Sequence, residues 1–192
     1  MKKRHLVYAI ALIVGMGACA ASAKKQAEAK PDVWKSYNVG TVLFEDKASE
    51  TKGSDIYHRI IPDAESYIKE QARTVLATLY NSPEDSITPV NKIHYTLEDI
   101  EGISAKGGGN GDVTIFYSTR HIEKSFAEND TAKLFFETRG VLLHELTHAY
   151  QLEPQGIGSY GTNRVFWAFI EGMADCLLYT SDAADEGLGV DL

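Results

Sequence analysis

The sequence predicts a single α+β domain, and three observations support this fold class. The chain has 192 residues, which is enough for one ordinary domain with its own core. Hydrophobic residues make up 44% and charged residues 24% of the chain, a composition typical of globular proteins. Short segments with strand-like alternation are interspersed with longer segments in which apolar residues repeat at helical spacing. We therefore expect strands and helices combined in one domain.

The first residues have the pattern of a secretory signal peptide. Residues 1–4 carry three basic side chains, residues 6–18 are apolar, and Ala21-Ser22-Ala23 forms a cleavage site of small residues. The apolar stretch is shorter than the about 20 residues of a membrane-spanning helix, so we expect no such segment in the mature chain. We predict a signal peptide over residues 1–23 and export to the periplasm or the extracellular space. Cys19 closes the apolar stretch and leaves an alternative open, a lipoprotein anchored through this cysteine.

The charge of the chain argues against a nucleic-acid partner. The whole chain carries 19 Lys and Arg against 27 Asp and Glu, a formal net charge of −8. Without residues 1–23 the basic count falls to 16 and the acidic count is unchanged, which gives −11. Phosphate binding depends on clustered positive charge, so we expect no nucleic acid among the partners.

After the predicted signal peptide, the chain alternates between expected strands and helices. Residues 24–32 are small, charged and poor in apolar side chains, as in a short linker. We expect strands at residues 35–39, 41–44, 92–97 and 113–117, and helices at residues 63–80, 138–152 and from 165 to at least 175. Residues 107–111, Gly-Gly-Gly-Asn-Gly, predict a turn or flexible loop and lack the Lys-Ser/Thr ending of a phosphate-binding loop.

The motif His144-Glu145-Leu146-Thr147-His148 lies within the expected helix over residues 138–152. Positions i and i+4 share one face of a helix, so His144 and His148 can present two imidazole nitrogens to one metal ion. Glu145 can then lie beside the metal and accept a proton from water. The plainer interpretation is a helix with two surface histidines and an exposed Glu.

A third metal ligand is expected from the last helix. Cys19 lies in the predicted signal peptide and Cys176 near the end of the chain, so the site has to use His and carboxylate ligands. Glu171 and Asp175 are four residues apart and share a helix face. Glu171 can complete a zinc site of two His and one Glu, and Asp175 can accept the outer N–H of a ligand histidine. The reverse assignment, with Asp175 as ligand and Glu171 as support, stays open.

These motifs resemble the basic secretory protein family, secreted metallopeptidase-like proteins of plants and bacteria within the wider zincin group. The matching positions are residues 140–142, residues 144–148, Gln151, residues 156–158 and residues 170–175. The resemblance covers about residues 33–175 and implies a single zincin-like metallopeptidase domain. This domain would contain a small mixed sheet, an active-site helix carrying HExxH and a following helix carrying the third ligand. One departure is charge, since this chain is acidic and the family name describes basic members.

The resemblance also implies roles for the motif residues. The helix with Glu171 and Asp175 looks like that of gluzincins, which makes His144, His148 and Glu171 zinc (Zn2+) ligands. Glu145 is then the general base, and Asp175 holds a ligand histidine. The implied reaction is hydrolysis of a peptide bond in a protein or peptide substrate. The alternatives are a secreted binding module that keeps the zinc fold without turnover, or an inactive fragment of such a peptidase.

The family likeness stops at Asp175. Residues 176–186 look like the in-frame translation of a transposon-end adapter used in preparing DNA sequencing libraries. We therefore expect that residues 176–192 are not native and that the C-terminal part of the domain is missing.

Other features are expected to support the site or to be unrelated to it. By analogy with other zincins, the strand at residues 113–117 is expected to offer its edge to an extended substrate. Tyr150, Tyr160 and Asn163 are candidates for stabilising the oxyanion, and the sequence favours none of them. The remaining histidines have no partner at metal-binding spacing, so we expect ordinary surface or core side chains at His58, His94 and His121.

Overall fold

The computed structural model describes residues 33–85, 87–125 and 131–185, and side chains as far as Leu177. The predicted signal peptide and linker, over residues 1–32, and residues 186–192 lie outside the described residues. The described part is a mixed α+β fold, as predicted, with five helices and a four-stranded sheet. The helices are α2 (Lys52–Ile60), α3 (Ala64–Leu79), α4 (Thr119–Ser125), α5 (Thr131–Tyr150) and α6 (Arg164–Asp185), and the strands are β1 (Thr41–Asp46), β2 (Lys92–Glu98), β3 (Ser104–Gly109) and β4 (Asp112–Ser118).

The sheet has the strand order β1-β2-β4-β3. β1, β2 and β4 are parallel to one another, and β3 is antiparallel to β4. β3 and β4 form a hairpin through Asn110 and Gly111, which both have positive φ, at 55° and 84°. These two angles match the two-residue turn that Asn-Gly favours between antiparallel strands.

This hairpin corrects two expectations from the sequence. Residues 107–109 belong to β3, and only Asn110 and Gly111 make the turn, because an exposed edge strand tolerates glycines that are rare inside sheets. β4 pairs with β2 on one side and with β3 on the other, so residues 113–117 offer no free edge. The free edge beside β4 is that of β3.

The predicted long helices are present, and the short elements differ from the expectation. Residues 35–39 contain no strand, although Trp34 and Val39 are buried in the core. α5 begins at Thr131, about two turns before the expected start at residue 138, and Leu134 in this extra part is fully buried. α2 was not expected, and it begins where the Thr51 side chain accepts a hydrogen bond from the Ser54 N–H.

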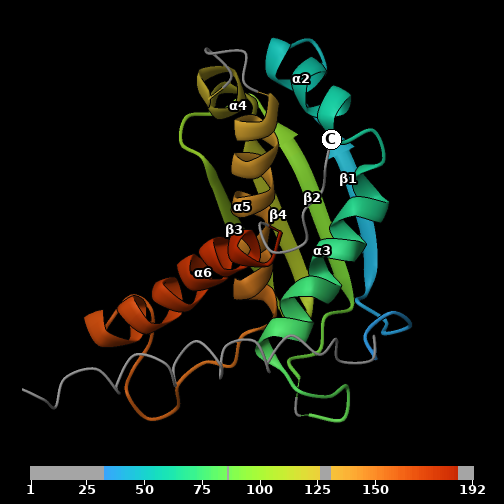
Figure 1. The fold of residues 1–192 in the computed structure, drawn as a ribbon. Helices are drawn as coiled ribbons and strands as arrows, with labels where there is room; N and C mark the ends of the chain where they lie inside the picture. The colour runs from blue at the N-terminus through green and yellow to red at the C-terminus, as the bar shows by residue number, and fades with distance from the viewer. Residues whose placement is uncertain (1–32, 86, 126–130, 186–192) are drawn as a thin grey trace, which may run out of the picture. The chain divides into compact units, whose positions relative to one another are not determined.

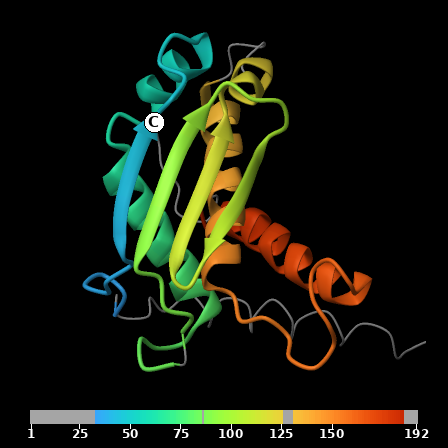
Figure 2. The ribbon, with the colours of Figure 1, turned by 180° about the vertical axis from the view of Figure 1, so that it is seen from behind.

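Helices α3 and α5 cover one face of the sheet, as Figure 1 shows, and α6 crosses the end of α5. Figure 2 shows the opposite face, on which no described helix lies. Side chains alternate accordingly, with Ile93, Tyr95 and Leu97 of β2 buried under the helices. His94, on the opposite face, is partly exposed and pairs with Glu45 of β1. The core therefore lies between the sheet and its helical layer.

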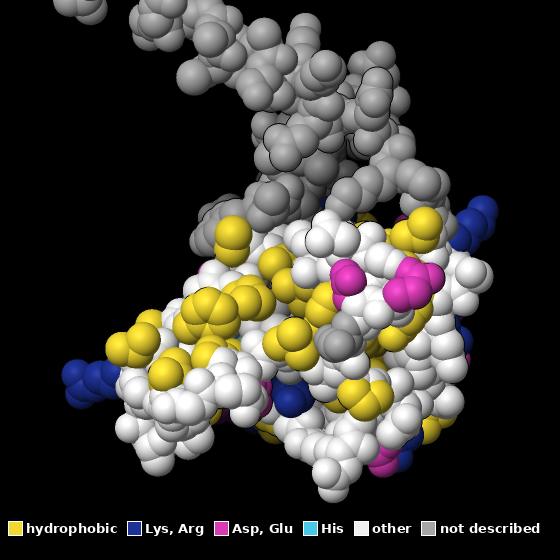
Figure 3. Space-filling view, turned by 90° about the horizontal axis from the view of Figure 1, so that it is seen from below, with side chains coloured by type: hydrophobic (Ala, Val, Ile, Leu, Met, Phe, Trp, Pro, Cys, Tyr) yellow, Lys and Arg dark blue, Asp and Glu magenta, His cyan; other side chains and the backbone are white. Residues whose placement is uncertain are grey.

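α6 packs on α5 through one side, and this contact determines which α6 residues lie beside the motif. Phe166, Ile170, Ala174 and Leu177 are buried and repeat at helical spacing. Val165, Trp167 and Phe169 are exposed on other sides of the helix, and Figure 3 shows hydrophobic side chains gathered over this part of the molecule. No described helix is long and apolar enough to cross a membrane.

Candidate metal centre

α5 brings the two motif histidines together. Leu142, Leu143 and Leu146 are buried and hold the helix against the core, so the side chains of His144 and His148 leave it on its outer face. Their Nε2 atoms are 3.0 Å apart, and the two rings are edge to face with centroids 4.7 Å apart. The i, i+4 spacing therefore points two imidazole nitrogens at one position, as the sequence predicts.

Glu171 of α6 adds an oxygen to the same position. Its Oε2 lies 3.3 Å from Nε2 of His144 and 3.6 Å from Nε2 of His148. Tetrahedral ligands at bond lengths of about 2.0–2.1 Å are separated from one another by roughly 3.3 Å. The three observed separations, 3.0, 3.3 and 3.6 Å, bracket that value. His144, His148 and Glu171 therefore form a group that could hold a metal ion.

Asp175 lies on the other side of the His144 ring. Its Oδ1 is 3.1 Å from Nδ1 of His144, and its side chain is 59% exposed. Nδ1 donating to this carboxylate leaves the lone pair of His144 on Nε2, the nitrogen that faces His148 and Glu171. The position of Asp175 thus suits a hydrogen-bond partner of His144 Nδ1. It does not suit a metal ligand, because it lies on the side of the ring away from His148 and Glu171.

Gln151 lies beside Nδ1 of His148, the ring nitrogen that corresponds to the one Asp175 contacts in His144. The Gln151 side-chain amide is 2.7 Å from Nδ1 of His148, with Nε2 as the nearer atom. Its Oε1 is buried and has no hydrogen-bond partner among the described residues. Rotating the Gln151 amide by 180° exchanges its oxygen and nitrogen and places Oε1 at Nδ1 of His148. There Oε1 accepts the ring N–H, which leaves the lone pair of His148 on its Nε2. The orphaned oxygen therefore fits a site in which His148 binds a metal through Nε2.

Glu145 is buried beside these three side chains. It is 5% exposed, and its Oε1 accepts a hydrogen bond of 2.6 Å from the Ser104 hydroxyl on β3. Burial raises the pKa of Glu145, and the hydrogen bond from Ser104 opposes that rise. Burial lowers the pKa of His148, and nearby His144 lowers it further, which favours the neutral imidazole that metals bind. The site thus places a carboxylate with a raised pKa beside an imidazole with a lowered pKa.

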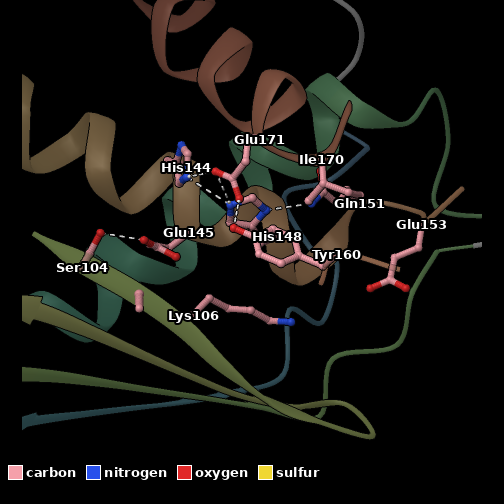
Figure 4. A pocket seen from close by; sticks show the side chains of 11 residues that line it. Ser104, Lys106, His144, Glu145, His148, Gln151, Glu153, Tyr160, Ile170 and Glu171 are labelled. Atoms are coloured by element: carbon pink, nitrogen blue, oxygen red, sulfur yellow. Dashed lines mark hydrogen bonds and ion pairs between the residues drawn. The ribbon is translucent and has the colours of Figure 1, made fainter. Parts of the chain in front are cut away.

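A pocket of about 440 Å³ opens over this group. Figure 4 shows that its lining comes from β3 on one side, α5 at the centre, and α6 with the preceding loop on the other side. The lining residues are Ser104, Ala105, Lys106, His144, Glu145, His148, Gln151, Glu153, Tyr160, Ile170 and Glu171. Lys106 is the basic side chain in this lining apart from the histidines, and it extends from the edge strand below His148 and Tyr160.

The structure distinguishes between the three residues that the sequence left as equal candidates for stabilising the oxyanion. Tyr160 lines the pocket, and its hydroxyl bonds to Glu171 at 2.8 Å. Tyr150 is buried, with its hydroxyl bonded to the Val39 carbonyl, and it does not line the pocket. Asn163 accepts from the Val165 N–H at the start of α6 and acts in capping that helix. Only Tyr160 among the three is placed to act in the pocket.

The remaining described histidines lie outside the metal-competent group. The Nε2 atoms of His58, His94 and His121 lie within 2.9–3.1 Å of the carboxylates of Asp46, Glu45 and Glu137, respectively. These contacts agree with the expectation of ordinary structural side chains. By contrast, Ser104 and Lys106 line the pocket and were not expected from the sequence, because a glycine-rich segment gave no strand signal that would place them beside α5.

The fold and the site define a mixed α+β protein with a two-His-one-Glu group and a buried carboxylate beside it. The model of the basic secretory protein family, described as peptidase of plants and bacteria, matches residues 39–187. The chain belongs to this family, and at the family level it is a peptidase. No curated protein and no solved structure matches the chain. The family match extends beyond Asp175, the predicted end of the family likeness, to residue 187, and α6 continues without a break to Asp185. The domain boundaries at residues 33 and 175, and the non-native origin of residues 176–192, stay predictions.

Proposed function

We propose that this chain is an exported zinc-dependent peptidase. The observation that carries the proposal is the convergence of His144 Nε2, His148 Nε2 and Glu171 Oε2, with Glu145 buried beside them. Two nitrogens and one carboxylate oxygen form a ligand set typical of catalytic zinc, with a fourth position left for water. Membership of a peptidase family supports peptide bonds as the substrate class.

In this proposal His144, His148 and Glu171 hold the metal, and Asp175 orients His144. These residues would hold a zinc ion, which would supply Lewis-acid chemistry and activate water as a nucleophile near neutral pH. The arrangement of an HExxH helix followed by the helix of the proposed third ligand supports a zincin-like domain. We assign this domain to residues 33–175, after a signal peptide over residues 1–23 and a linker over residues 24–32.

Glu145 transfers the proton in the proposed reaction. Ser104 occupies Oε1 of Glu145, so the second carboxylate oxygen stays available to a water molecule in the pocket. Glu145 accepts a proton from the attacking water and then gives it to the leaving amine nitrogen. The raised pKa that burial produces suits both roles, because the carboxylate has to bind and release a proton near neutral pH.

The edge of β3 supports binding of an extended peptide. The Ser118 N–H donates to the Ile103 carbonyl, so this pair is hydrogen-bonded across the β3–β4 ladder. Bonded pairs alternate in an antiparallel ladder, which turns the backbone groups of Ser104, Lys106 and Gly108 outward. Both Ser104 and Lys106 line the pocket, so a peptide added along this edge passes the metal centre.

Substitution of Glu145 separates the chemistry from metal binding. We expect Glu145→Gln and Glu145→Ala to lose peptide hydrolysis by about 100-fold or more, the range for general acid–base catalysis, while zinc stays bound. His148→Ala should lose zinc, because it removes one of three ligands. His94→Ala is the matched control, since it removes a carboxylate-paired histidine outside the site and should keep both zinc and activity.

The measurements are zinc content per chain and the rate of hydrolysis of an unfolded protein substrate. Hydrolysis that persists in Glu145→Ala contradicts the assigned role of Glu145. Unchanged zinc content in His148→Ala contradicts the metal site. Zinc bound by the wild type without any hydrolysis favours a non-catalytic binding module.

A further inference from the structure

Tyr160 makes two hydrogen bonds through one hydroxyl group. The Trp167 Nε1–H donates to the Tyr160 oxygen at 3.0 Å, and the Tyr160 hydroxyl donates to Oε1 of Glu171 at 2.8 Å. A phenol has a single hydrogen, and the indole N–H can only donate, so the direction of both bonds is determined. Figure 4 shows Tyr160 reaching into the pocket beside Glu171.

The two oxygens of Glu171 therefore have different surroundings. Oε2 faces the Nε2 atoms of His144 and His148, at 3.3 and 3.6 Å. Oε1 is bonded to Tyr160 on the other side of the carboxylate. One oxygen is thus directed at the metal-competent group and the other is held away from it.

Hydrogen bonds within the loop before α6 hold Tyr160 in this position. The Thr162 and Asn163 N–H groups both donate to the Ser159 carbonyl at 3.0 Å, which makes a tight turn around Tyr160. The Asn163 side chain joins this turn to α6, because it accepts from Val165 N–H at 2.8 Å and donates to the Ile157 carbonyl. Trp167 lies seven residues beyond Tyr160 and is 48% exposed, yet the only polar atom of its side chain is bonded to Tyr160.

We propose that Tyr160, held by Trp167, is a positioning residue that keeps Oε1 of Glu171 away from the metal. This inference rests on the proposed zinc site. With Oε1 hydrogen-bonded to Tyr160, Glu171 would supply a single oxygen, Oε2, to a bound metal ion and would leave room for water. Without the hydroxyl, the carboxylate is free to rotate, to lose its alignment with the two imidazoles, or to supply both oxygens. Outer partners of metal ligands typically contribute 10- to 100-fold in metal affinity.

Tyr160→Phe removes the hydroxyl and keeps the ring, so it tests this role directly. We expect its zinc affinity, measured by competition with a chromophoric chelator, to fall by about 10-fold. The visible absorption of the Co(II)-substituted protein should also change in intensity and shape, because this signal depends on coordination number and geometry. Trp167→Phe, which removes the N–H alone, should shift both readouts in the same direction and by less.

Tyr150→Phe is the matched control. It removes a tyrosine hydroxyl that bonds to the Val39 carbonyl outside the pocket, so it should lower stability and leave zinc affinity and the Co(II) spectrum unchanged. If Tyr160→Phe keeps the wild-type zinc affinity and Co(II) spectrum, the positioning role is wrong while the zinc site stands. If the wild type binds no zinc, the proposed function and this inference both fail.

Discussion

The outer nitrogens of His144 and His148 have different partners. Nδ1 of His144 lies 3.1 Å from the Asp175 carboxylate, and Nδ1 of His148 lies 2.7 Å from the Gln151 amide. A ring that donates from Nδ1 keeps its lone pair on Nε2. Asp175 and Gln151 can therefore select the tautomer that both histidines need to bind one metal ion, one from α6 and the other from the end of α5.

Substitutions at Gln151 test this role. Gln151→Leu removes the acceptor for Nδ1–H of His148, so we expect zinc affinity to fall by about 10-fold. Gln151→Glu keeps an acceptor at the same place and should bind zinc at least as tightly as the wild type, whereas Gln151→Leu should bind it more weakly. Chelator competition on the purified variants measures both constants. Equal zinc affinity in Gln151→Leu and the wild type would show that Gln151 does not orient His148.

The sequence predicts the local parts of the site and misses the parts that come from elsewhere. His144, Glu145 and His148 are found because helical spacing places positions i and i+4 together. Glu171 and Asp175 are found by the same rule on the next helix. Ser104 was not expected, and Tyr160 was one of three candidates that the sequence left equal. These two residues reach the site through the sheet and through a loop turn, and nothing in their local sequence indicates the contacts with Glu145 and Glu171.

At the scale of elements, β3 shows where residue preferences mislead. Glycines are depleted in strands, so a run of three glycines predicts a loop. In the structure these glycines extend β3 along β4, and the Asn110-Gly111 turn sets the register of the hairpin. The result places Ser104 on the helix-facing side of the strand, within 2.6 Å of Glu145.

Helices α2 and α4 approach each other closely at Gly53. The Gly53 N–H donates to Glu123 at 2.9 Å, and a Cβ atom at Gly53 would lie 2.8 Å from Cβ of Thr119 and against its backbone carbonyl. In contrast, a Cβ atom at Gly172 on the exposed side of α6 would meet no atom within 4 Å. The two glycines form a matched pair for testing how these helices pack.

We expect Gly53→Ala to lower the free energy of unfolding by about 1–3 kcal/mol, because backbone has to move to make room. Gly172→Ala should raise it by about 0.5–1 kcal/mol, because alanine has the higher helix propensity. Chemical denaturation of the two variants measures both changes. A Gly53→Ala variant as stable as the wild type would contradict the close approach of α2 and α4.

At the scale of the whole described unit, the candidate site depends on three separate elements. α5 supplies two imidazoles and Glu145, α6 supplies Glu171 and Asp175, and β3 supplies Ser104 and the adjacent free edge. The long periodic helices were predictable from sequence, because their apolar spacing extends over several turns. The angle at which α6 crosses α5 was not predictable from sequence, since it depends on how Phe166, Ile170 and Ala174 pack against the neighbouring helix.

Removal and return of metal tests the central claim, zinc-dependent peptide hydrolysis at this site, most directly. The measurement is hydrolysis of an unfolded protein substrate by the purified chain after treatment with a chelator, followed by titration with zinc. We predict that chelation abolishes hydrolysis and that about one equivalent of zinc per chain restores it, while His148→Ala shows no recovery. Hydrolysis that survives complete metal removal, or that zinc restores equally in His148→Ala, would contradict the account.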